Sequence, residues 1–148
     1  MKQRPDDMTP PVDPPDYGKS LRGLTINLLS SDLARSVQFH QRVLDIEPDY
    51  ADADIALFDA FGVRWMLHAD HTYDKHPLHA RVSPVIGARG IGLEIRLHEL
   101  DPDAAAQRAV AAGFEVFDGP RDQPDHGLRE AHIIDADGYV WVPDVPLA

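Results

Sequence analysis

The sequence predicts an α+β fold made of two similar halves, each with the order strand, helix and then three strands. The first observation is an internal repeat, because a shift of 67 residues places Gly23–Leu28 on Gly90–Ile95. The second is a pair of hairpins whose second strands resemble each other. The corresponding residues are Gly62, Trp65 and Met66 in the first hairpin and Gly138, Trp141 and Val142 in the second. A repeated unit of this length predicts two modules that bury their apolar faces together.

Length and proline content predict the domain layout. The 148 residues suffice for one domain with its own core. Residues 1–18 contain five prolines among charged residues, so we expect an extended arm that forms neither a helix nor a central strand. One hypothesis is that this arm is held against the body or a partner subunit. The folded domain is expected at 19–148, with module one at about 21–70, a connection at about 70–89 and module two at about 90–143.

Module one begins with a strand at Leu24–Leu29, in which alternate residues are apolar. Ser30, Ser31 and Asp32 are typical N-cap residues, and they predict a helix that runs to about Leu44. A short acidic strand and a hairpin are expected to complete the module, at 47–51, 55–58 and 63–68. Alternation places Trp65 and its counterpart Trp141 on the face that packs beneath the helices.

Module two repeats this order. Its first strand is expected at Gly90–Leu97. Asp101, Pro102 and Asp103 then predict a helix start, by an N-cap acceptor, a proline at the first position and favourable charge. Gly113 is expected to end that helix. The remaining elements are expected to be a strand at 114–117, a turn-rich loop at 118–126 and a hairpin at 129–143 that turns at Asp135–Gly138.

Composition excludes several classes of function. The chain has no cysteine, which excludes disulfides, thiolate metal sites and a cysteine nucleophile. It has no apolar run of the roughly 20 residues that a membrane span needs, so we expect a cytoplasmic protein. The net charge of −11 repels nucleic acids and anionic membranes. A cationic, aromatic or neutral small organic molecule is the expected partner.

Several residues resemble the vicinal oxygen chelate superfamily, which includes glyoxalase I, extradiol dioxygenases and bleomycin-resistance proteins. The resemblance covers about 21–143, and it departs at His40 and Asp45, where tyrosine and glycine are usual. The matching positions are Asp32, Leu33, Ser36, Phe39 and Leu44, followed by the closing sequence DADGY at 135–139. This resemblance implies two βαβββ modules that form an open eight-stranded barrel-like sheet around a cavity, in a homodimer.

Metal-dependent members of this superfamily carry ligands on the first and fourth strands of each module. Carried over to this chain, those positions are Thr25, Met66, Gly92 and Val142. They lack the imidazole and carboxylate donors that divalent metals prefer, so we expect no metal and no other cofactor. A displaced metal site remains an alternative, because one stretch holds four histidines: His68, His71, His76 and His79.

Alternation along the strands assigns the residues that line the expected cavity. The candidate ligand-binding residues are Asn27, Arg64, Met66, His68, Glu94, Arg96 and Val142. The resemblance to extradiol dioxygenases places His132 at the position of a cavity tyrosine. Glu130 lies on the same face, and a histidine beside a glutamate is a workable acid–base pair, so these two are the candidate catalytic residues.

The leading functional hypothesis is a small-molecule-binding protein of the bleomycin-resistance type that holds an organic ligand without the usual metal. The alternative is a lyase, isomerase or dioxygenase of the same superfamily. It would use either the displaced histidines with a metal or the His132 and Glu130 pair. A third hypothesis is a structural or regulatory dimer whose cavity is filled by its own side chains.

Overall fold

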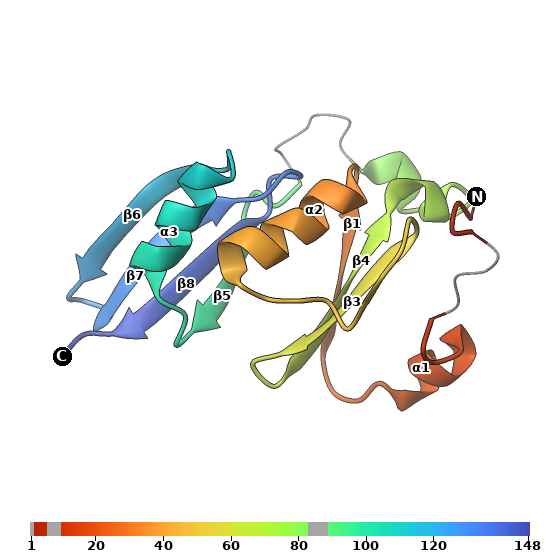
Figure 1. Ribbon diagram of the computed structural model, residues 1–148, viewed down its shortest axis with the longest axis horizontal. Helices are drawn as coiled ribbons and strands as arrows, with labels where there is room; N and C mark the ends of the chain where they lie inside the picture. The colour runs from red at the N-terminus through yellow and green to blue at the C-terminus, as the bar shows by residue number, and fades with distance from the viewer. Residues whose placement is uncertain (1, 6–9, 83–88) are drawn as a thin grey trace.

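The computed structural model describes residues 2–5, 10–82 and 89–148 and contains two four-stranded sheets. A helix packs against each sheet (Figure 1). The predicted α+β fold of two βαβββ modules is confirmed. The two sheets remain separate within the chain and do not close into a barrel.

Module one forms the sheet that we call sheet A, with the strand order β1-β4-β3-β2. The strands are β1 (Thr25–Ser30), β2 (Tyr50–Ala51), β3 (Ile55–Ala60) and β4 (Val63–Ala69). Strands β1 and β4 are parallel, while β3 pairs with β2 and β4 in antiparallel fashion. The predicted hairpin is therefore confirmed, and the acidic strand expected at 47–51 is reduced to two residues.

The helix of module one begins where the sequence predicts. The side chain of Asp32 caps α2 (Leu33–Phe39) by accepting a hydrogen bond from the backbone N–H of Arg35 at 3.0 Å. The helical segment continues as the π-helix η1 (His40–Leu44) and ends at Asp45, whose φ of 59° is left-handed. The predicted end near Leu44 is confirmed, whereas the widened last turns were not predicted.

Module two forms sheet B, with the strand order β5-β8-β7-β6. Its elements are β5 (Glu94–His98), α3 (Pro102–Ala111), β6 (Glu115–Gln123), β7 (Leu128–Ile134) and β8 (Val140–Pro146). The predicted cap at Asp101 and the closing hairpin are confirmed. The loop expected at 118–126 is wrong, because β6 continues to Gln123 across irregular register that includes the Gly119–Pro120 pair. A β-bulge leaves one or more residues of a strand unpaired while the strand continues on either side of them.

The repeat has a different spacing from the predicted one. The two N-caps, Asp32 and Asp101, are 69 residues apart, as are the first residues of β1 and β5. The predicted shift of 67 is therefore wrong by two. The strand expected from Gly90 begins only at Glu94, so Gly92, with a φ of 88°, lies in the preceding turn.

The apolar faces of both sheets border one core. Trp65 of β4 and Trp141 of β8 are 4% and 1% exposed, and their ring centroids lie 6.3 Å apart. Phe39 of α2 packs against Trp141 and against Phe114, with centroid distances of 6.2 and 4.9 Å. The predicted core position of both tryptophans is confirmed. The polar face of each sheet is therefore the one turned away from this core.

The closing turn of module two is bound to the start of α2. Asp137 is 2% exposed, and its Oδ1 accepts hydrogen bonds from Ser31 N–H at 2.9 Å and Ser31 Oγ at 2.6 Å. Arg89 adds an ion pair to Asp137 at 3.5 Å and a hydrogen bond to the carbonyl of Leu29. These contacts fix one end of sheet A against one end of sheet B.

We expect Asp137→Ala to lower the free energy of unfolding by about 2 kcal/mol, because it leaves the Ser31 donors without their acceptor. Urea titration of both proteins measures this difference. The matched control is Asp32→Ala, which removes one cap bond and is expected to cost about 1 kcal/mol. A cost at Asp137 no larger than that at Asp32 would show that the link between modules contributes little.

The last part of the N-terminal segment is helical, whereas the sequence predicts an extended arm. A short helix, α1 (Pro14–Ser20), replaces part of the expected extended arm. Proline disfavours the interior of a helix, but Pro14 and Pro15 occupy the first two positions, where the missing N–H is not needed. The backbone N–H groups of Gln3 and Arg4 bind the Asp54 carboxylate at 2.7 and 3.1 Å. The described start of the arm therefore lies against module one.

The connection between the modules contains two short 3₁₀ helices, η2 (Asp70–Tyr73) and η3 (His79–Arg81). The part of the predicted connection at 83–88 lies outside the described residues. Among the described helices, none is long and apolar enough to cross a membrane.

Candidate functional site

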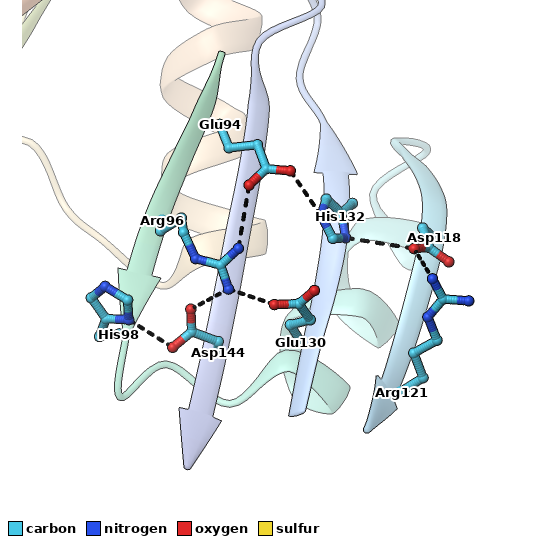
Figure 2. A network of polar contacts seen from close by, with 8 residues as sticks. All are labelled: Glu94, Arg96, His98, Asp118, Arg121, Glu130, His132 and Asp144. Atoms are coloured by element: carbon cyan, nitrogen blue, oxygen red, sulfur yellow. Dashed lines mark hydrogen bonds and ion pairs between the residues drawn. The ribbon is translucent and has the colours of Figure 1, made fainter. Parts of the chain in front are cut away.

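The polar face of sheet B carries a connected group of charged side chains on the side away from α3 (Figure 2). Strands β5, β6, β7 and β8 all contribute to this group, which we call the charged network. Its members are Glu94, Arg96, His98, Asp118, Arg121, Glu130, His132 and Asp144. Four of them, Glu94, Arg96, Glu130 and His132, are candidates from the sequence.

Arg96 joins the two most buried carboxylates of the network. Its Nη2 donates to Glu130 Oε2 at 2.5 Å and to Asp144 Oδ2 at 3.0 Å. The side chains of Glu130 and Asp144 are 4% and 1% exposed. Burial lowers the pKa of Arg96, but the hydrogen bonds that it donates to both carboxylates outweigh burial and raise that pKa. Glu130 is thus bound to a permanent cation and is poorly placed to act as a base.

His132 lies between two carboxylates that face solvent. Its Nε2 is 3.2 Å from Glu94 Oε1, and its Nδ1 is 3.9 Å from Asp118 Oδ2. The ring of Phe117 packs beside it at a centroid distance of 5.3 Å. The structure therefore pairs His132 with Glu94 and binds Glu130 to Arg96. The geometry of a histidine held by a carboxylate is suited to orienting a ligand or accepting a proton.

The positions of the metal ligands in the superfamily do not fit a metal in this chain. Val142 is fully buried, and Gly92 lies outside β5. In the observed register, Asn27 lies opposite Met66 and Arg96 opposite Val142. An amide, a thioether, a guanidinium and an alkyl group do not form a site for a hard or borderline divalent ion. Instead, the guanidinium of Arg96 is the cation that the nearby carboxylates surround.

The candidates on sheet A occupy a separate polar face. His68 Nδ1 lies 2.7 Å from Asn27 Oδ1, and Asn27 Nδ2 donates to Tyr73 Oη at 2.6 Å. Burial lowers the pKa of His68, and the nearby charge of Asp52 opposes this shift. Arg64 lies further along β4 and binds Asp59 at 2.8 Å.

The N-terminal segment covers part of this face of sheet A. A cavity of about 290 Å³ lies between the two, and Met66 and His68 form part of its floor. Tyr17 and Pro14 of α1, together with Val12, form part of the opposite wall. Met66 thus faces this chain's own N-terminal segment.

The four histidines of the connection do not converge. His71 Nε2 binds Asp54 Oδ1 at 2.8 Å, and His76 Nδ1 accepts a hydrogen bond from the backbone N–H of Leu78. Across residues 2–5, 10–82 and 89–148, no three His, Asp or Glu side chains are grouped so that they could hold a metal ion. The displaced histidine site therefore receives no support from the described geometry.

The sequence interpretation missed four members of the charged network: His98, Asp118, Arg121 and Asp144. Two of them could have been found by alternation. His98 follows Arg96 by two residues, and Asp144 follows Val142 by two, so each shares the face of its neighbour. Asp118 and Arg121 could not, because the sequence predicts a loop where β6 continues.

The paired modules, with a helix against each sheet and polar groups on the opposite face, define a class of α+β proteins built from repeated βαβββ units. The sequence profile of the Glyoxalase/Bleomycin resistance protein/Dioxygenase superfamily matches residues 24–142. The chain belongs to this superfamily. A search of curated protein sequences gave no match.

Solved structures show the same fold at low sequence identity. A glyoxalase/bleomycin resistance protein/dioxygenase family enzyme from Burkholderia phytofirmans PsJN has a TM-score of 0.68 and 17% identity, over 83% of this chain and 97% of its own. A glyoxalase-related enzyme from Fulvimarina pelagi has a TM-score of 0.66 and 20% identity, over 84% and 87%.

A third structure is a variant of the fosfomycin resistance protein FosX from Listeria monocytogenes. It was solved with Mn(II) and 1S,2S-dihydroxypropylphosphonic acid. Its TM-score is 0.57 at 17% identity, over 83% of this chain and 89% of its own. At these identities the likeness establishes the fold alone.

Proposed function

We propose that this chain is a cytoplasmic small-molecule-binding protein that holds a cationic organic ligand on the polar face of sheet B. The observation that carries this proposal is the charge of the network. It contains four carboxylates and two guanidinium groups, an excess of two negative charges when both histidines are neutral. A site with this excess attracts a cation before contact, and the net charge of −11 adds to the attraction.

The contacts suggest where an ammonium group would bind. Arg96 already neutralises much of the charge on Glu130 and Asp144. Glu94 and Asp118 are 49% and 31% exposed, so the solvent-facing lone pairs of their oxygens can accept further hydrogen bonds from a ligand. The exposed ring of Phe117 beside His132 supplies an apolar and cation–π surface. A primary amine that carries an aromatic ring fits these groups.

The same charge distribution disfavours a phosphonate such as the one in the FosX complex. An anion at Glu94 and Asp118 would meet like charges and would lack an unpaired guanidinium. Arg96 and Arg121, the guanidinium groups of the network, already form ion pairs within it. We therefore place this chain on the binding-protein side of the superfamily, with a ligand of opposite charge to a phosphonate.

We propose a homodimer as the ligand-binding form. The charged network on sheet B and the Asn27–His68 pair on sheet A make no described contact with each other in one chain, so we expect a cavity lined by both to form with a second copy. Leu24 and Ile91, near the starts of β1 and β5, are 75% and 82% exposed and offer apolar contacts for that copy. The expected ligand contacts then include Asn27 and His68 of one chain facing Glu94 and His132 of the other.

The proposal predicts selective stabilisation by a cationic aromatic amine. In a thermal-shift assay, 2-phenylethylamine is expected to raise the melting temperature, whereas phenylphosphonate is not. A ligand at 100 times its dissociation constant stabilises by about 2.7 kcal/mol. Glu94→Gln is expected to weaken amine binding about tenfold, because it removes one charge-assisted hydrogen bond.

The matched control is Glu47→Gln, an exposed carboxylate of module one that binds Gln41. It is expected to leave amine binding unchanged. Stabilisation by phenylphosphonate alone, or equal loss of amine binding in both variants, would contradict the site. Sedimentation of the same samples gives the molecular mass, and a monomer that binds the amine at full affinity would contradict the dimer.

A further inference from the structure

A second cavity lies at the junction of the two modules and borders the charged network, because Arg96 and His98 contribute to its lining. Its volume is about 310 Å³, which is within the range of small-molecule sites. Trp65 and Trp141 contribute to its lining. These are the only tryptophans of the chain. The remaining walls are mainly apolar and include Ile26, Val63, Ile95 and Leu97.

The cavity lies between two strands that are sheet edges. Strand β1 pairs only with β4, and β5 pairs only with β8, in the part of the chain that the structure describes. Ile26 from β1 and Ile95 from β5 line the cavity. Edge strands present unpaired backbone N–H and C=O groups. The cavity thus combines an aromatic and aliphatic lining with backbone hydrogen-bonding groups, and it lies within a single chain.

Backbone strain is concentrated at this cavity. Within the described ranges, three residues other than glycine have a positive φ: Asp45, Phe61 and Glu99. Phe61 and Glu99, with φ of 55° and 66°, both line the cavity. Phe61 precedes Gly62 in the tight β3–β4 turn, a position where asparagine or glycine is preferred. Strained residues persist only where the surrounding structure holds them, and they cluster at active sites and ligand clamps.

We propose that this junction cavity binds a small, uncharged aromatic molecule of two or three rings that carries one hydrogen-bonding group. The aromatic rings would contact the two tryptophans, and the polar group would meet a free strand edge. Phe61 is 49% exposed at the turn and covers the bound molecule from the solvent side. This site adjoins the charged network at Arg96 and His98, and it differs from the network in the charge of its ligand.

The probe for this site is N-phenyl-1-naphthylamine, an uncharged fluorescent amine with one N–H donor. Because the cavity contains both tryptophans, tryptophan excitation is expected to transfer energy to the bound probe in a saturable titration. Ala60→Phe fills the cavity from β3 and is expected to weaken binding at least tenfold. The matched control, Ala111→Phe, makes the same change on the exposed side of α3 and is expected to bind as the natural protein does.

Phe61→Asn tests the role of the strained turn without depending on a filled cavity. It removes the ring and favours the observed turn conformation, so the melting temperature is expected to stay or rise while probe affinity falls about tenfold. Unchanged binding in Phe61→Asn and in Ala60→Phe would overturn the proposal. So would a probe that competes with self-association of the chain, because the cavity would then be an interface between copies. Saturable transfer that both variants weaken, at constant molecular mass, supports it.

Discussion

Replacing Arg96 by methionine is expected to lower the free energy of unfolding by about 3 to 5 kcal/mol, the cost of removing one partner from a buried ion pair. Methionine keeps much of the volume of the side chain but leaves Glu130 and Asp144 without their cation. Both carboxylates are almost fully buried, so water cannot replace the guanidinium. Urea denaturation at pH 7 measures the loss.

The pH dependence of this loss distinguishes an electrostatic cause from a packing defect. Without Arg96, the two buried carboxylates carry negative charge that nothing compensates, and this uncompensated charge is what destabilises the variant. Acid neutralises carboxylates and so removes the cause of the loss. The deficit of Arg96→Met is therefore expected to shrink as the pH falls toward 4.

Arg121→Met is the matched control for Arg96. It breaks an exposed ion pair with Asp118, in which the Arg121 side chain is 58% exposed. Such a pair contributes about 0 to 1 kcal/mol. Similar costs at both arginines, or a deficit at Arg96 that does not change with pH, would contradict a structural role for the buried cation.

The sequence predicts the faces of the strands well because the period of a strand is two. The error in the repeat, 67 residues in place of 69, is an even number, so each residue keeps its face but moves along the strand by one row. Alternation along the two hairpins placed Trp65 and Trp141 correctly in the core, independently of this shift. The sequence paired Val142 of the fourth strand with Gly92 of the first. In the observed register, the residue opposite Val142 is Arg96.

The site was predicted less completely, for a reason that concerns packing in three dimensions. Alternation brings Glu94, Arg96, Glu130 and His132 to one face, and the structure confirms that they meet there. Alternation cannot predict which carboxylate binds Arg96 and which binds His132, because these pairings depend on distances between neighbouring strands. His132 pairs with Glu94, and Arg96 binds Glu130 as well as an unpredicted residue, Asp144.

The sequence does not predict how the two modules are placed relative to each other. A repeat predicts two similar sheets, but the direction in which each polar face points depends on how α2 and α3 pack. Here Phe39 and both tryptophans share one core, which sends the polar faces outward. The helix starts at Asp32 and Asp101 were predicted correctly, because a single capping side chain determines where each helix begins.

His40→Ala is expected to lower the free energy of unfolding at pH 7 by about 3 to 5 kcal/mol, as for large core residues replaced by alanine. His40 is fully buried and stacks on Phe58 at a centroid distance of 4.4 Å. Its Nδ1 donates to the carbonyl of Ser36, and its Nε2 accepts from Trp65 Nε1 at 3.1 Å. The substitution leaves a cavity and an indole N–H without a partner.

The cost of His40→Ala is expected to fall by about 3 kcal/mol between pH 7 and pH 4. Burial lowers the pKa of His40 to about 4, whereas the unfolded chain takes up this proton near 6.5. The stability that neutral His40 contributes is thus complete above 6.5 and is lost as the pH falls. Asp135 acts in the opposite sense, because burial raises its pKa to about 6 and its protonation favours the folded state.

The opposing effects of His40 and Asp135 nearly cancel in the natural protein between pH 6 and 4, so only the difference between the two proteins isolates the histidine. Urea titrations of both proteins across this range provide that difference. The matched control is His126→Ala, which changes an exposed histidine and is expected to cost little stability. A cost at His40 that stays constant with pH would mean that the folded protein accommodates the protonated ring. The neutral imidazole would then not be required by the core that joins the two modules.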